Sequence, residues 1–423
     1  MDRSGRDRVL GHVRMPPVRA AFAVCVVSAI VAVSSLPASS AAPVRAPREE
    51  YTFLVATPLS SPHPVLGADD RIHVVYGLFV FNPTRSVMRL KELQILDASR
   101  HDSVIATERG SRIVARLSEV DLDGRGGPGN ACANTLTLGA HQFGCLFLDA
   151  TFPRGARVPR RLEHRFTFTL TPAPEGRPST DTAVTGFVRV AQDSPVVIGP
   201  PLAGSRWVAG EGCCSPPSHH VAFVGAVNGS FYNPQRFAID FVQLDASGKL
   251  YSGPFSDLRS YHFFGAPVLS VAAGVVVGLQ DGFPEETPPE GVAPITAQNF
   301  LGNYLVIDIG GGHFAVYAHL QPGSLRVHVG EHVRQGQVIG LLGNTGNSNL
   351  PHLHFEIISG PGIATSDALP FVIRSFVSEG TITSSILDLA AGNPAAIGPV
   401  SRGLHRRQMP LLQEVIDFPA SPR

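Results

Sequence analysis

Short segments in which apolar and polar residues alternate recur along this chain, and they constrain its fold more than any other feature. In HRFTFTL (164–170), Phe166, Phe168 and Leu170 have one parity and two threonines have the other. Successive side chains of a β-strand point to opposite faces, so such a segment can bury one face of a sheet. The chain also has 43 glycines and 36 prolines among 423 residues, which favours turn-rich β-structure over helices. We therefore expect an all-β protein.

The alternating segments predict two β-domains separated by a proline-rich boundary. Residues 50–193 contain about eight such segments with turns between them, the pattern of an immunoglobulin-like β-sandwich. The passage SPVVIGPPLAG (194–204) marks the boundary. Residues 205–372 then combine strands with tight glycine turns, which predicts a second domain of antiparallel sheet. Residues 373–423 form a C-terminal extension, either structural or disordered, without a motif that indicates a function.

The first 42 residues are typical of an export signal. Arg8, Arg14 and Arg19 lie before an apolar run at 20–36, and small residues follow at Ser40 and Ala42. We expect cleavage after this segment and a location outside the cytoplasm, either secreted or in the cell envelope. No later stretch is long enough to cross a bilayer, so the mature chain should have no transmembrane segment.

Charge and cysteine usage agree with an exported protein that does not bind nucleic acid. Lys+Arg and Asp+Glu both count 34, so there is no basic surplus for a nucleic-acid partner. Four cysteines remain after the signal, and exported chains can form disulfides: Cys132, Cys145, Cys213 and Cys214. Cys132 and Cys145 could close a hairpin. Adjacent cysteines rarely bond each other without strain, so both of the GCC pair could instead bond 132 and 145.

Four polar residues stand among apolar neighbours in the second half of the chain. In PHLHFEI (351–357), His352 and His354 should share one face of a strand, roughly 6–7 Å apart. Asp240 lies within the apolar run FAIDFVQL, and His319 ends the strand before the turn in YAHLQPG. A buried carboxylate must be paired or bound to a cation, because an isolated one is too costly. A catalytic zinc needs three ligands of these types plus an open position for water.

A longer run makes a family resemblance specific. GNYLVIDIGGGHFAVYAHLQPGSLRVHVGEHVRQGQVIGLLGNTGNSNLPHLHFEI (302–357) resembles the lysostaphin/LytM-type zinc metalloendopeptidases, which cut peptide bonds in bacterial peptidoglycan. GAPVLSVAAGVV (265–276) is similar to the segment that precedes it in that family. The resemblance covers about residues 220–372 and excludes the N-terminal sandwich. It implies a LytM-like peptidase domain at 205–372, a zinc cofactor and peptidoglycan peptides as substrates.

The resemblance also implies roles for individual residues. His354 and Asp240 would be zinc ligands, while His319 and His352 would orient water and stabilise the tetrahedral intermediate. The family's first ligand is a histidine four residues before the aspartate, but this chain has Arg236 there. A guanidinium has no lone pair to give a metal. Another residue must therefore supply the third ligand, or the site is degenerate.

Several residues could replace the missing ligand. His219 and His220, in CCSPPSHH, lie shortly before the Asp240 strand, and we prefer His220. Cys213, Cys214 and His262 are further candidates. The expected function is thus an exported zinc endopeptidase acting on peptidoglycan. The alternative is a degenerate family member that binds the cell wall or regulates another hydrolase.

A carrier-protein interpretation can be excluded from the same segment. VGEHVRQGQVIGLLG (329–343) also resembles the hairpin of biotinyl and lipoyl carrier domains. Those carriers need a lysine at the hairpin tip for the cofactor. The chain's only lysines are Lys91 and Lys249, and both lie outside this hairpin.

Overall fold

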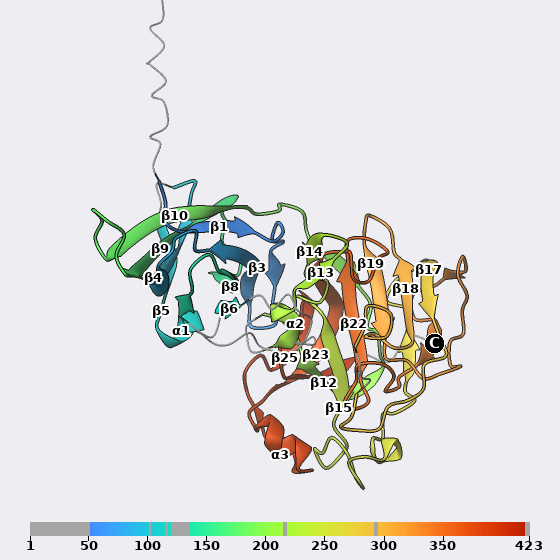
Figure 1. Cartoon of the computed structure of the whole chain (residues 1–423). Helices are drawn as coiled ribbons and strands as arrows, with labels where there is room; N and C mark the ends of the chain where they lie inside the picture. The colour runs from blue at the N-terminus through green and yellow to red at the C-terminus, as the bar shows by residue number, and fades with distance from the viewer. Residues whose placement is uncertain are drawn as a thin grey trace, which may run out of the picture. The chain divides into compact units, whose positions relative to one another are not determined.

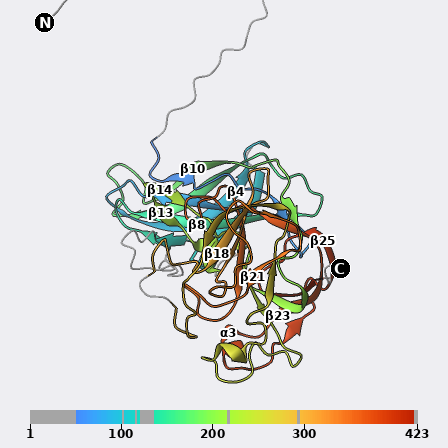
Figure 2. The ribbon, with the colours of Figure 1, turned by 90° about the vertical axis from the view of Figure 1, so that its right-hand side faces the viewer.

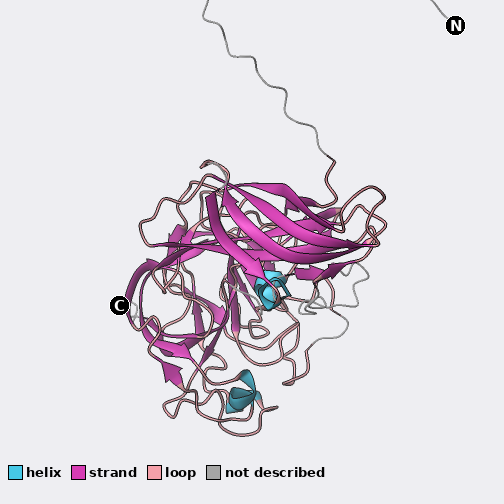
Figure 3. Ribbon diagram, turned by 90° about the vertical axis from the view of Figure 1, so that its left-hand side faces the viewer, coloured by secondary structure: helices cyan, strands magenta, loops and turns pink. Residues whose placement is uncertain are grey.

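The computed structural model describes residues 51–100, 103–114, 117–119, 136–214, 218–291 and 295–418, and residues 51–423 form one compact unit. The predicted signal peptide and Cys132 lie outside the described residues. Strands dominate the described chain (Figure 3), which confirms the all-β prediction. The α-helices within the described residues are short: α1 (Ser111–Val114), α2 (His219–Ala222) and α3 (Ile386–Ala390). None of the described helices has the length and apolar character that a bilayer-spanning helix needs.

Two five-stranded antiparallel sheets form the N-terminal sandwich. One has the order β1-β3-β8-β6 with β2 beside β3: β1 (Val55–Pro58), β2 (Val65–Leu66), β3 (Arg71–Phe81), β6 (Leu117–Glu119) and β8 (Phe143–Pro153). The other has the order β10-β9-β4-β5 with β7 beside β4: β4 (Val87–Asp97), β5 (Ser103–Arg109), β7 (Thr137–Leu138), β9 (Arg161–Thr171) and β10 (Thr180–Arg189). Apolar residues of both sheets form one core, so the sandwich itself is observed. Its immunoglobulin-like class stays a prediction.

The alternation in 164–170 explains how β9 packs. Phe166, Phe168 and Leu170 are each at most 1% exposed and belong to the core between the two sheets. Thr167 and Thr169, on the opposite face, are partly exposed. Burying these three large side chains contributes roughly 1.5–3 kcal/mol each. The sequence pattern therefore predicted both the strand and the face that it buries.

A twelve-stranded sheet forms the rest of the framework (Figure 1 and Figure 2). Its main path runs β11 (Val196–Ile198), β23 (Phe371–Ile382), β26 (Glu414–Phe418), β12 (Gly204–Glu211), β15 (Ile239–Gln243), β22 (Leu353–Ile358), β19 (Phe314–Ala318), β18 (Tyr304–Asp308), β17 (Gly274–Gln280) and β20 (His332–Val333). β24 (Ile397–Gly398) and β25 (Gly403–Gln408) both pair with β23. Two separate two-stranded antiparallel sheets consist of β13 (Gly225–Val227) with β14 (Ser230–Tyr232), and of β16 (Pro267–Leu269) with β21 (Val338–Leu341). A single 3-10 turn spans Leu258–Ser260.

The C-terminal residues belong to this sheet. The predicted domain boundary at 372 falls inside β23, and β26 pairs with β12, the strand next to β15. Phe376, Ile416 and Phe418 are buried in the same core as Phe355 of β22. The extension is thus structural over its described residues, because its apolar side chains complete the core beneath the central strands.

The sandwich and the large sheet share part of one hydrophobic core. Val75 and Phe147 of the sandwich belong to the same buried cluster as Phe371 of β23. Main-chain hydrogen bonds link Ala68 N–H to the Met409 carbonyl and Met409 N–H to the Leu66 carbonyl. These contacts explain why residues 51–423 form one unit.

The cysteines adjacent in sequence bond to each other. Cys213 and Cys214 form a disulfide directly after β12, and both are buried. The expectation that this pair would avoid a mutual bond was wrong, and so was the proposed cross-pairing of both with 132 and 145. Leu412 N–H donates to the Cys213 carbonyl, which holds this segment within the core. The pairing of Cys132 with Cys145 stays a prediction.

Glu414, in β26, is a buried acid that we expect to limit stability at neutral pH. Burial raises its pKa to about 7, and its Oε1 atom has no hydrogen-bond partner. A folded-state pKa above the unfolded value penalises the ionised form, so stability falls as pH rises from about 4.5 through 7. At about 1.4 kcal/mol per pKa unit, Glu414→Gln should stabilise the protein by about 3 kcal/mol at pH 8. No gain is expected at pH 4, and urea unfolding at both pH values checks this.

Candidate active site

One row of residues across four neighbouring strands brings the predicted site together. Glu211 of β12 pairs with Asp240 of β15, Asp240 pairs with His354 of β22, and His354 pairs with Ala318 of β19. Directly opposite residues in antiparallel strands lie about 4.5–5.5 Å apart, so the row is continuous. His319 follows Ala318 at the end of β19. Strand pairing therefore places Asp240, His354 and His319 at one point of the sheet.

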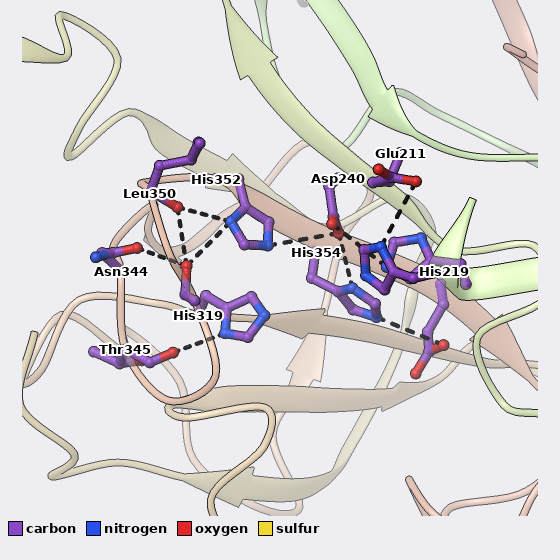
Figure 4. A network of polar contacts seen from close by, with 12 residues as sticks. Glu211, His219, Asp240, His319, Asn344, Thr345, Leu350, His352 and His354 are labelled. Atoms are coloured by element: carbon purple, nitrogen blue, oxygen red, sulfur yellow. Dashed lines mark hydrogen bonds and ion pairs between the residues drawn. The ribbon is translucent and has the colours of Figure 1, made fainter. Parts of the chain in front are cut away.

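Asp240 is surrounded by imidazoles (Figure 4). Its Oδ1 atom lies 2.9 Å from His354 Nδ1 and 3.6 Å from His352 Nε2, and its Oδ2 atom lies 3.4 Å from His220 Nε2. The prediction that this carboxylate must be paired is confirmed. His352 and His354 both approach Asp240 Oδ1, so they share one face as their spacing predicted.

Backbone carbonyls fix the rings of the two predicted catalytic histidines. His319 Nδ1 lies 2.7 Å from the Thr345 carbonyl oxygen, and His352 Nδ1 lies 2.9 Å from that of Leu350 (Figure 4). A carbonyl only accepts, so each Nδ1 donates and each Nε2 keeps its lone pair in the neutral ring. The two rings lie 4.5 Å apart between centroids. His319 also has φ +60°, a costly conformation for a non-glycine residue that often occurs at functional sites.

Burial and mutual contacts shift the pKa values of Asp240 and the four surrounding histidines (His220, His319, His352 and His354) in different directions. Burial raises the pKa of Asp240, but the imidazoles of His220, His352 and His354 outweigh this and hold it well below its usual range. Burial also lowers the pKa of His220, His319 and His352. His354 is the exception, because its contacts with Asp240 and Glu356 overcome burial and raise its pKa to about 10. Near pH 7 the cluster thus holds one carboxylate–imidazolium pair and three neutral histidines.

The donors around Asp240 fit a zinc ion. A carboxylate and imidazole nitrogens are the ligands of catalytic zinc sites. His220 Nδ1 and His354 Nε2 are buried without a hydrogen-bond partner, so each of these two rings has one nitrogen that makes no hydrogen bond. His219 joins the group, because one donor atom from each of His219, His220 and Asp240 lies within 4.8 Å of the others. His219 and His220, adjacent in α2, therefore both lie close enough to Asp240 to be the third ligand.

Arg236, which occupies the usual position of the first ligand, lies in a different environment. Its side chain is buried, and Nη1 donates to Ser60 Oγ at 3.1 Å. Burial lowers its pKa to about 10, and the nearby Asp367 carboxylate opposes this effect. Its hydrogen bond thus goes to the N-terminal sandwich. The imidazole of His220 instead reaches Asp240 from α2.

Sequence reasoning missed three supporting contacts. Glu211 Oε2 lies 3.7 Å from His219 Nδ1, and Glu356 Oε2 lies 3.7 Å from His354 Nε2. Glu356 is 1% exposed, and neither of its oxygens has a hydrogen-bond partner. The signal that could have found it is its parity with His352 and His354 in the strand. Carboxylates behind metal-binding histidines commonly orient the ring and raise its basicity.

The third contact is a short polar relay behind His352. Ser348 Oγ lies 3.1 Å from His352 Nδ1 and donates to Asn344 Oδ1 at 2.6 Å. Asn344 and Ser348 are both buried, as is Thr345, whose carbonyl holds His319. The 344–348 loop therefore positions both catalytic candidates.

Part of this chain is similar to known peptidases. Residues 259–364 match peptidase family M23. The chain is 42% identical over 86 residues to the peptidoglycan DD-endopeptidase ShyA of Vibrio cholerae, a match that spans 20% of each chain. It is 32% identical over 123 residues to lysostaphin of Staphylococcus simulans, covering 28% of this chain and 22% of lysostaphin.

Solved structures of such peptidases are also similar to part of this chain. The catalytic domain of lysostaphin from Staphylococcus simulans aligns over 39% of this chain and 88% of that domain, with 22% identity and a TM-score of 0.23. The chain spans about a fifth of the length of ShyA and lysostaphin. In its C-terminal half, at residues 259–364, the chain carries a domain of peptidase family M23.

Proposed function

We propose that this protein is an exported zinc metalloendopeptidase that hydrolyses peptide bonds in bacterial cell-wall peptidoglycan. The observation that carries the proposal is the contact of one carboxylate, Asp240, with His220, His352 and His354. The M23 domain and its relatives named as peptidoglycan endopeptidases support the reaction and the substrate class. The proposed location is outside the cell or in its envelope, where peptidoglycan lies.

The side chains divide into a metal-binding set and a proton-transfer set. His220, Asp240 and His354 would hold the zinc ion. When bound, zinc polarises the substrate carbonyl and lowers the pKa of water towards ~7. His319 and His352 hold their Nδ1 protons on backbone carbonyls, so their Nε2 atoms can accept a proton from the attacking water. The same Nε2–H groups can then stabilise the developing oxyanion or donate to the departing amine.

The proposal is tested by measuring zinc and turnover together. The exported chain should contain about one zinc per molecule by mass spectrometry and release peptide fragments from purified peptidoglycan. A chelator should remove both zinc and activity, and added zinc should restore them. Peptidoglycan that stays intact with zinc-loaded, folded protein would exclude the hydrolase assignment.

His220 is the third ligand in this proposal, and its replacement should weaken zinc binding. His220→Ala is expected to reduce zinc affinity by on the order of 100-fold or more, because one of three protein donors is removed. The matched variant His219→Ala, at the adjacent position of α2, should retain zinc more tightly than His220→Ala. Competition with a coloured chelator measures both affinities. A greater loss in His219→Ala would transfer the role to that residue.

The alternative function is a degenerate family member that binds the wall or regulates another hydrolase. Arg236, at the usual position of the first ligand, is the observation that favours it. It requires binding to peptidoglycan without turnover, unchanged by a chelator. Cleavage that a chelator abolishes would exclude it.

A further inference from the structure

A second group of metal-binding side chains lies outside the candidate active site. His73 is in β3, Asp149 is in β8 and Cys214 follows β12. One donor atom from each of the three lies within 4.8 Å of the others. The His73 and Asp149 side chains are 8% and 5% exposed, and Cys214 is 6% exposed.

Strand pairing explains why two of these side chains meet. His73 pairs with Thr151, and Asp149 is two residues along the same strand, so both side chains point to one face of the sheet. His73 Nδ1 lies 2.7 Å from Asp149 Oδ2, and His73 Nε2 lies 3.1 Å from Asp69 Oδ1. The imidazole is therefore held between two carboxylates.

One oxygen of this group has no partner. Asp149 Oδ1 is buried and makes no hydrogen bond. Most buried polar atoms are hydrogen-bonded, because an unsatisfied one costs about 1–3 kcal/mol. The other oxygen of the Asp149 carboxylate, Oδ2, is the one that contacts His73. Asp149 and His73 form the group with Cys214. A buried carboxylate oxygen without a hydrogen-bond donor, beside a histidine and a cysteine, is an atom that could bind a cation.

We propose that reduction of the Cys213–Cys214 disulfide creates a second metal site, in which His73, Asp149 and Cys214 bind a thiophilic divalent cation such as zinc. In the disulfide, the Cys214 sulfur has no thiolate charge to give a metal. Two thiols of a reductant would supply two electrons and two protons, becoming a disulfide themselves and leaving two cysteine thiols. Metal binding then displaces the proton from Cys214 and leaves His73 neutral.

The resulting donor set suits zinc. One thiolate, one imidazole and one carboxylate are all common zinc ligands, and two negative charges balance the cation. Typical zinc–ligand lengths of about 2.0–2.3 Å place donor atoms roughly 3.3–3.8 Å apart, so the group needs to close by on the order of 1 Å. Asp69 can keep its contact with the other nitrogen of His73, which would orient the ring. This inference is independent of the hydrolase proposal.

The metal would join two parts of the fold. His73 and Asp149 belong to the N-terminal sandwich, whereas Cys214 precedes α2, which carries His220. An occupied site would therefore connect the sandwich to the segment that leads to α2.

Cobalt(II) is the probe, because a thiolate ligand gives it a strong near-ultraviolet charge-transfer band. The experiment uses the full chain carrying Asp240→Ala, which removes the central carboxylate of the first site. A phosphine reduces the disulfide: the phosphine becomes its oxide, and water supplies the two protons. After anaerobic removal of the phosphine, we expect one equivalent of cobalt with the thiolate band, and no band in the oxidised protein.

Two matched single substitutions in the same Asp240→Ala chain identify the sulfur. Cys213→Ser leaves Cys214 as a thiol without any reductant, and it should show the band with at least a tenfold tighter cobalt affinity than Cys214→Ser. Asp149→Asn in the reduced protein should weaken binding by a similar factor. Circular dichroism checks that each variant is folded. An equal band in the two cysteine variants, or none in folded Cys213→Ser, would overturn the proposal.

Discussion

Asp240→Ala is expected to abolish stoichiometric zinc binding and to lower the rate of peptidoglycan hydrolysis by at least ~10³-fold. Asp240 is the carboxylate on which three imidazoles converge, at 2.9, 3.4 and 3.6 Å. Its removal takes away one zinc ligand and the charge that balances the cation. It also leaves the His354 imidazolium without its closest counter-ion. Zinc content by mass spectrometry and release of soluble peptides measure the two effects.

Asp308→Ala is the matched control for this substitution. Asp308 ends β18 in the same sheet, and its Oδ1 accepts from Gly310 N–H within its own turn. This variant should keep both zinc and activity. If Asp240→Ala remained zinc-loaded and active, the carboxylate would have only a structural role and the site assignment would be wrong.

His352→Ala is expected to retain zinc while kcat falls by about 10²–10⁴-fold, with a smaller change in KM. The ring is held by the Leu350 carbonyl and Ser348, and its Nε2 lies 3.6 Å from Asp240 Oδ1. In the proposed reaction its Nε2 exchanges a proton with the reacting groups. Its removal should therefore weaken stabilisation of the transition state more than binding of the substrate. Zinc stoichiometry and steady-state kinetics on a defined cell-wall peptide separate the two quantities.

The short distance to Asp240 makes the zinc measurement decisive for His352. Loss of zinc in step with activity would make His352 a ligand and leave His319 as the sole predicted proton carrier. His328→Ala serves as the control, because His328 is largely exposed and pairs with Glu331 on a turn. That variant should match the parent in zinc content and rate.

The local alternation of apolar and polar residues in the sequence was enough to find most of the candidate site. The parity of PHLHFEI placed His352 and His354 on one face, and the apolar neighbours of Asp240 indicated that it needs a partner. Both expectations hold in the structure, because alternation along a strand is a local property of the backbone. The role of each histidine came from the family resemblance and stays a proposal.

Other features depended on contacts between distant segments. Cys213 and Cys214 bond each other, which rules out the cross-pairing of both with 132 and 145 that the sequence had left open. The C-terminal extension has no motif, yet β23 and β26 lie within the large sheet. The parity of Glu356 with His352 and His354 indicated a shared face, but only the structure showed that its carboxylate lies 3.7 Å from His354 Nε2.

By itself, the sequence determined that this chain forms strands, which faces they bury and which side chains are suited to zinc and proton transfer. Those properties follow from residue type and from a period of two along the backbone. Which distant side chains meet depends instead on how the strands and loops pack together. Strand pairing aligned Asp240 with His354, a separate helical turn brought His220 to Asp240, and Arg236 formed its hydrogen bond with Ser60 of the sandwich. Strand register and packing set these long-range distances, and no local pattern encodes them.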